Sequence, residues 1–182
     1  MLSQPWRGYV ERALAQRGRF WQVAERSGTG PLGQQLRLIA GRVDAGVGES
    51  WEVAQRGHAL SQARGAVPVL DVQRQLDQTR QWLTNPGLDA ETRVTYERTI
   101  EALEAQVASA KRMENVIGRA DAQLRLLDAR LGEAVARVAE LSSGADTAAL
   151  GSVGDDVEGV VTEMEALRQA LEEVGSASIR VA

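Results

Sequence analysis

One feature restricts the fold of this sequence more than any other: a heptad pattern of apolar residues that runs from Tyr96 to Leu141. Successive apolar positions lie alternately four and three residues apart, which is the spacing of a coiled-coil seam. The pattern predicts one helix over residues 89–142. At 1.5 Å per residue that helix would be about 80 Å long. Because a single helix cannot bury its own seam, at least one partner helix is expected.

The seam has one irregularity. Between Val107 and Met113 a spacing of three residues occurs twice in succession, through Ala110. Such a stammer is expected to overwind the supercoil locally. We expect the seam to form the main interaction surface of the chain, and its strongest positions are Ile100, Leu103, Val107, Ile117, Leu124, Leu131 and Val138.

Two shorter segments are suitable partners for the long helix. Residues 153–175 repeat the four-and-three spacing without a fault and add Val157, Met164 and Leu171 to the predicted seam. Residues 68–84 carry a similar pattern and meet the long helix across the tight turn at Asn85–Gly87. Both segments are expected to lie antiparallel to the long helix, one along each half.

The residues before this region predict two more helices, over 5–26 and 31–64, each opening at a proline. The second contains interior glycines, each of which costs about 1 kcal/mol relative to alanine. Two explanations remain open: a close helix crossing through Gly41, Ala45 and Gly48, or a break in the helix near 44–48.

No segment alternates apolar and polar residues between turn signals, so no strand is predicted. The expected fold is all-α with about five helices: an N-terminal helical part and an elongated antiparallel coiled-coil or helical-hairpin part. We divide the chain into an N-terminal helical region at 1–66, a coiled-coil region at 67–176 and a C-terminal tail at 177–182.

The first helix carries an unusually aromatic face, while three of its arginines fall on the opposite side. One interpretation is that this face docks on a helical core or on a protein partner. The other is that it binds an anionic membrane surface, because cationic amphipathic helices with aromatic edges do so. The residues of the face are Trp6, Tyr9, Leu14, Phe20 and Trp21.

An amphipathic first helix ahead of a long helical hairpin resembles, in outline only, membrane-remodelling proteins of the phage-shock-protein-A type. The aromatic content of the first helix and the glycine-containing second helix depart from that type. The resemblance implies a peripheral membrane protein that assembles through its coiled coil.

The composition argues against catalysis and against cofactors. The chain has no Cys and one His, His58, with no metal-binding spacing around it, so we expect a helix-face histidine paired with a neighbouring acid. The segment Gly28–Gly33 matches G-x-G-x-x-G, but a helix precedes it and Pro31 removes one backbone amide. We therefore expect a linker there, and no catalytic, metal or cofactor site.

Charge and hydropathy restrict the partners and the location. The net charge of -4 disfavours nucleic acid, whose binding depends on basic side chains. The sequence has no apolar run of about 20 residues and no signal-peptide core at its start. A cytoplasmic protein is expected, which could also lie at the inner face of the membrane.

Together these patterns predict a non-enzymatic coiled-coil scaffold or adaptor. It would bind protein partners through helical surfaces and associate with itself through the unpaired part of the seam. The alternative is a peripheral protein that binds anionic lipid through residues 5–26 and assembles through its coiled coil.

Overall fold

The computed structural model describes residues 2–142 and 150–179, and this part of the chain is all-α. The prediction of an all-α fold with about five helices is confirmed. The helices are α1 (Trp6–Arg26), α2 (Pro31–Ala66), α3 (Val69–Leu83), α4 (Ala90–Ser142) and α5 (Leu150–Ile179).

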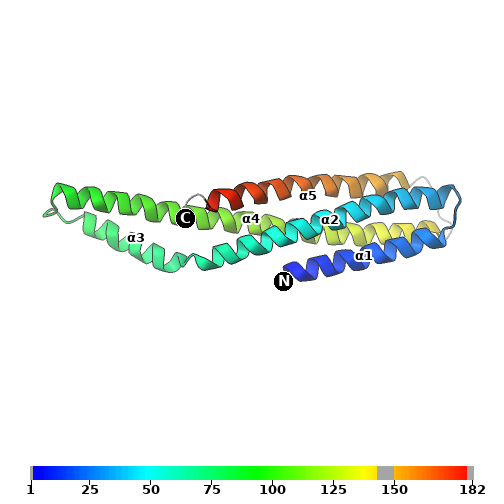
Figure 1. Ribbon diagram of the computed structural model, residues 1–182, viewed down its shortest axis with the longest axis horizontal. Helices are drawn as coiled ribbons and strands as arrows, with labels where there is room; N and C mark the ends of the chain where they lie inside the picture. The colour runs from blue at the N-terminus through cyan, green and yellow to red at the C-terminus, as the bar shows by residue number, and fades with distance from the viewer. Residues whose placement is uncertain (1, 143–149, 180–182) are drawn as a thin grey trace.

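The molecule is elongated (Figure 1). Helices α2 and α3 follow one another toward one end, α4 returns along the whole length, and α5 lies beside the second half of α4. The second half of α4 forms a four-helix bundle with α1, α2 and α5, while its first half pairs with α3 alone. We call this α3–α4 pair the hairpin; it extends beyond the bundle.

Polar contacts between helices show their relative directions. On α1, Tyr9 bonds Asp121 and Arg12 bonds Asp128, so α1 and α4 run in the same direction. Trp6, at the start of α1, lies against Gly57 of α2. Arg17, later on α1, pairs with Asp44, which comes earlier on α2, so α1 and α2 are antiparallel.

Helix α5 runs antiparallel to α4, as predicted, since Gln123 bonds Glu163 while the later Arg137 bonds the earlier Asp156. The same helix runs parallel to α2. Helices α2 and α4 also pack on each other, so α1 and α5 flank a central α2–α4 pair (Figure 1).

The apolar side chains form two separate clusters. The main core takes residues from α1, α2, α4 and α5, and therefore from both of the regions predicted at 1–66 and 67–176. A small second cluster consists of Val72, Leu76 and Leu103 in the hairpin. This division of the core gives a packed bundle and a thinner hairpin that projects from it.

The stammer in the seam lies where α4 leaves the hairpin and enters the bundle. Val107 is the last seam position packed against the hairpin cluster, and Met113 is the first that belongs to the main core. The change of spacing in the sequence thus coincides with a change of partner helices.

Helix α2 is continuous, so the predicted break near 44–48 is wrong. The predicted crossing through Gly41 and Gly48 is also wrong, because a Cβ atom at either position would meet nothing within 4 Å. The close contact is at Gly46 instead, where a Cβ would lie 3.3 Å from Val161 Cγ2 and 3.8 Å from Leu127 Cδ1.

Two predicted segments lie at the limits of the described residues. Residues 177–179 of the predicted tail belong to α5, and residues 180–182 lie outside the described part of the chain. The expected turn between the long helix and the last helix falls largely within 143–149, which also lies outside it.

Candidate interaction surfaces

The aromatic face of α1 is docked on the bundle. Trp6, Tyr9 and Phe20 are each at most 4% exposed, and Trp21 is partly buried against the main core. Leu14 differs, because 48% of its surface is exposed. Of the two interpretations of this face, docking on a helical core describes the positions of Trp6, Tyr9 and Phe20.

A glycine on α2 makes room for the first of these aromatics. The Trp6 ring packs so closely on Gly57 that a Cβ atom there would lie 2.5 Å from Trp6 Cη2 and Cζ3. No real Cβ approaches a ring carbon so closely, so a side chain at 57 and the ring at 6 exclude each other. Gly57 is thus required by packing and not by a bend.

Asp44 on α2 binds two residues of α1. The Arg17 Nε atom donates to Asp44 Oδ1 at 2.5 Å, and Trp21 Nε1 donates to the same oxygen at 3.0 Å. Partial burial by itself would raise the pKa of Asp44, but the hydrogen bonds from Arg17 and Trp21 outweigh it and lower the pKa below its usual value. The charged form therefore helps to hold α1 on α2.

This lowered pKa predicts a loss of stability in acid. A carboxyl whose pKa is lower in the folded state stabilises the fold above its unfolded pKa of about 3.9 and stops doing so as the pH falls through the folded value. We expect Asp44→Asn to cost at most about 1 kcal/mol at pH 7, since the pair is partly solvated. It should also flatten the acid dependence of urea unfolding below about pH 4.

The control is the same substitution at Asp77, an exposed residue of α3. Asp77→Asn should leave both the stability and its acid dependence close to those of the wild type. An equally steep loss of stability in acid for Asp44→Asn would contradict the role given to this carboxylate.

A second polar cluster joins α1 to α4. The Tyr9 hydroxyl donates to Asp121 Oδ1 at 2.5 Å, and Arg125 donates to the other oxygen of that carboxylate at 2.9 Å. Burial and the Asp121 carboxylate both raise the pKa of Tyr9. The Arg12 guanidinium lies over the Tyr9 ring at 4.9 Å and bonds Asp128 at 2.6 Å. These contacts fix the position of α1 along α4.

The predicted seam residues are packed within one chain. Three of them are partly buried: Ile100 and Val107 in the hairpin, and Ile117 against the main core. The others are buried, Leu103 in the hairpin and the rest in the bundle: Leu124, Leu131, Val138, Val157, Met164 and Leu171.

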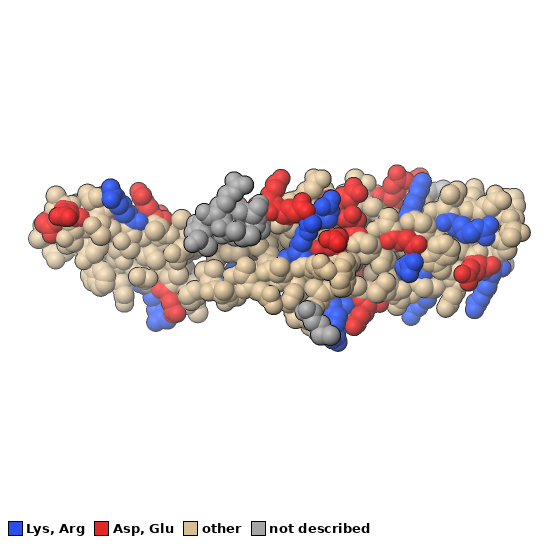
Figure 2. Space-filling model, viewed as in Figure 1, with Lys and Arg blue, Asp and Glu red and all other residues tan. Residues whose placement is uncertain are grey.

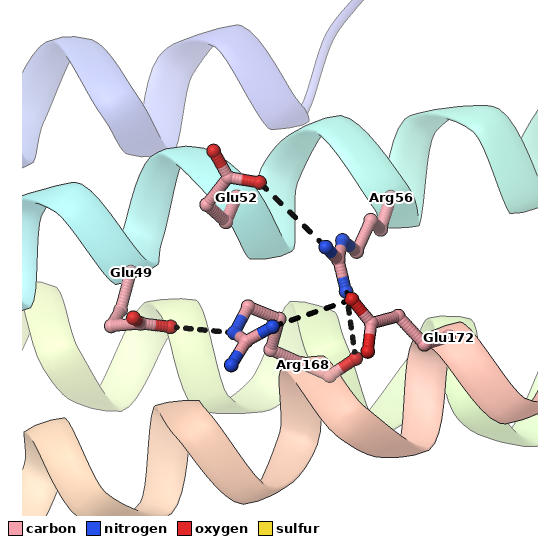
Figure 3. Close-up of polar contacts among 5 residues, drawn as sticks. All are labelled: Glu49, Glu52, Arg56, Arg168 and Glu172. Carbon is pink, nitrogen blue, oxygen red and sulfur yellow. Dashed lines mark hydrogen bonds and ion pairs between the residues drawn. The ribbon is translucent and has the colours of Figure 1, made fainter.

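A charged network links α2 to α5 along the edge of the bundle (Figure 3). Arg168 on α5 pairs with Glu49 of α2 at 3.3 Å and with Glu172 one turn later, also at 3.3 Å. Arg56 pairs with Glu172 and with Glu52, and it also donates to the backbone oxygen of Arg168. Since each carboxylate here has a cationic partner, the network sets the register of α5 on α2.

The histidine of α2 contacts a serine that precedes α1. His58 is partly buried on α2, and its Nδ1 atom lies 3.1 Å from the Ser3 hydroxyl. The predicted pairing with a neighbouring acid is therefore replaced by a contact with a serine. Within the described residues no group of three His, Cys, Asp or Glu side chains is placed to hold a metal ion.

Gly28–Gly30 form the turn between α1 and α2, as the sequence context predicted, and Pro31–Gly33 begin α2. Gly28 has a φ of 72°, a left-handed conformation that favours glycine. A Cβ atom at Gly33 would lie 2.0 Å from the Gly28 carbonyl oxygen, so only glycine fits there. The turn itself therefore explains both glycines, without a bound phosphate.

The far end of the hairpin presents an exposed aromatic pair. The rings of Trp82 on α3 and Tyr96 on α4 are 5.9 Å apart and tilted by 35°, and Trp82 is 54% exposed. They line a shallow pocket of about 340 Å³ whose lining contains no charged residue; its other members are Gln81, Thr84, Asn85 and Leu88. Nothing in the sequence pattern indicates this pair, because the two residues are separated by the turn at Asn85–Gly87.

As far as the helices are described, none combines the length and the apolar character needed to cross a bilayer. No protein-family model, no curated protein and no solved structure matches this chain.

Proposed function

We propose that this chain is a non-enzymatic helical scaffold or adaptor that binds a protein partner at the end of its hairpin. The observation that carries the proposal is the exposed Trp82 ring beside Tyr96, at the end of an arm that extends beyond the packed bundle (Figure 1). We also propose a cytoplasmic location, on the sequence argument given above.

The chemistry of this end suits a protein contact. Aromatic residues are enriched at protein interfaces, and Trp and Tyr are among the residues that contribute most to binding there. A pocket lined by Trp82, Tyr96 and Leu88, with uncharged polar groups at its rim, fits an apolar side chain of a partner. The projecting hairpin leaves this end accessible.

The bundle is suited to the role of a rigid body. Its core joins four helices, and the polar contacts of Asp44, Asp121 and Arg168 fix α1 and α5 on the central pair. Lipid binding through α1 would require Trp6 and Phe20 to leave this core, at the cost of exposing them to water during the exchange. We therefore assign α1 a structural role.

A site-specific crosslinking experiment tests the proposal. A photoreactive amino acid at Gln81, which lines the pocket, should capture one protein partner in the cells that produce the chain. The same probe at Gln73, an exposed residue of α3 farther from the tip, should not capture it. Adding Trp82→Ala to the Gln81 probe should abolish capture, and since Trp82 is exposed, the melting temperature should hardly change.

Two results would contradict this function. One is an identical set of captured proteins at positions 81 and 73, which would indicate non-specific contact. The other is capture at position 81 that survives Trp82→Ala, which would remove the aromatic pair from the interaction.

A further inference from the structure

The end of the hairpin carries negative charge beside its aromatic pair. Residues 81–92 run from the end of α3 to the first turn of α4, and they contain Asp89 and Glu91 but no Lys or Arg. Figure 2 shows acidic atoms at this end of the molecule (left), and the first basic side chain of the visible face lies farther along the hairpin. The pocket of Trp82 and Tyr96 therefore lies next to charges of one sign.

Neither of these two carboxylates is paired with a cation. Asp89 Oδ1 accepts from the Thr92 backbone N–H at 2.8 Å, and Asp89 Oδ2 accepts from the Thr92 hydroxyl at 2.7 Å. These neutral donors lower the pKa of Asp89, the backbone bond more than the side-chain bond, so the carboxyl is charged at neutral pH. Glu91 is exposed. Within the described part of the hairpin, the ion pairs are Arg74–Asp71 and Arg80–Glu104, which include neither acid.

The start of α4 offsets only part of this charge. The N-terminus of a helix carries the equivalent of about half a positive elementary charge. It explains why acids are favourable at Asp89 and Glu91, but two carboxylates exceed it. The end of the hairpin is therefore negative overall.

The nearest cations of the hairpin lie on its other side. Arg80 donates to Glu104 at 2.6 Å, and Arg93 and Glu97 share the side of α4 that carries Glu104, because they precede it by eleven and seven residues. Trp82 follows Arg80 by two residues, a rotation of about 200° around α3. A cation that approaches Trp82 is therefore separated from these arginines by the hairpin itself.

We infer that the protein partner contributes an arginine to this end of the hairpin, where its guanidinium stacks on Trp82 and faces the Asp89 and Glu91 carboxylates. The inference rests on the proposed function, since it names the chemistry of the partner bound there. Arginine is favoured because its planar guanidinium stacks on aromatic rings and is only weakly hydrated. The Trp82 ring is 54% exposed, and the apolar stem of the arginine suits the uncharged pocket beside Leu88.

A peptide titration of the isotope-labelled full chain tests the charge. The two probes are the peptide acetyl-Ala-Arg-Ala-amide and the same peptide with citrulline, which has the shape of arginine but no charge. At millimolar concentration the arginine peptide should shift the backbone amide NMR signals of residues 81–96. The citrulline peptide should bind about fivefold more weakly or worse, and added salt should weaken only the arginine peptide.

Variants locate the binding. Combining Asp89→Asn with Glu91→Gln removes both charges, while asparagine still caps α4, and should weaken the arginine peptide about threefold or more. The matched control is Glu97→Gln on the other side of α4, which should keep the affinity of the wild type. Trp82→Ala should remove the shift at Tyr96. Melting curves of all these variants should match the wild type, because the four side chains are exposed.

The same double charge variant, added to the photoreactive probe at Gln81, separates this inference from the proposed function. It should reduce capture of the partner. If Trp82→Ala abolishes capture while the double charge variant leaves it unchanged, the hairpin binds a partner without the arginine, and only the inference is overturned. Equal affinity for the two peptides, or no shift with the arginine peptide, would also overturn it.

Discussion

Replacing Leu124 by glutamate should unfold the bundle. Leu124 is 1% exposed on α4 and belongs to the main core, where α4 packs on the other three helices of the bundle. Removing such a side chain costs about 2–5 kcal/mol, and burying a carboxylate adds several more. The sum is comparable to the whole stability of a typical domain, about 5–15 kcal/mol.

The expected result is a large loss of helical circular dichroism at 25 °C, or a melting temperature lowered by tens of degrees. The matched control is Leu126→Glu, two residues along the same helix, where the side chain is 37% exposed. This control should change the free energy of unfolding by about 0.5 kcal/mol or less. Equal effects at 124 and 126 would mean that α4 is rotated relative to the structure described here.

Replacing Gly57 by leucine should release the start of α1. The new Cβ would lie 2.5 Å from atoms of the Trp6 ring, which is 3% exposed. Overpacking costs about 1–3 kcal/mol even for small insertions, and a displaced tryptophan also loses its buried area. We expect a loss of about 3 kcal/mol or more in urea unfolding.

Two further variants isolate the steric cause. Gly118→Leu on α4 introduces the same side chain where a Cβ meets nothing within 4 Å, and it should be neutral or stabilising because leucine favours helix. Combining Gly57→Leu with Trp6→Ala should cost much less than the sum of the two single changes, since the ring that clashes is gone. Strict additivity would show that the two residues are not in contact.

Local patterns in the sequence were sufficient to predict the helices. The prolines and the turn residues mark their ends, and the four-and-three spacing identified which residues of α4 and α5 face inward. The antiparallel α4–α5 and α3–α4 pairs follow from short connections between neighbouring segments. Each of these predictions depends on residues that are close in the sequence.

Contacts between distant segments were not predictable in the same way. Nothing in the pattern of α1 indicates that Tyr9 bonds Asp121, or that Trp6 lies on Gly57. For the same reason Gly46, which packs on α4 and α5, was not distinguished from the solvent-facing Gly41 and Gly48. Helical periodicity gives the direction of a side chain but not the identity of the helix that it meets.

The end of the hairpin was missed for a related reason. Tyr96 was assigned to the seam and Trp82 had no predicted role, although the structure brings their rings together. Trp51 on α2, which also had no predicted role, is 43% exposed. A large apolar residue at a boundary position fits either side of a helix, so its exposure depends on the neighbouring helices.

The docking of α1 on α4 has a consequence for the order of synthesis. Helix α1 leaves the ribosome before α4, and Asp121 and Asp128, which bind it, follow more than 100 residues later. At about 5–20 residues per second, the aromatic side of α1 waits at least several seconds for its position on α4. During that time Trp6 can pack on Gly57 of α2, but the side of α1 that faces α4 is uncovered, so the newly made chain is most vulnerable to aggregation before residues 121–138 have emerged.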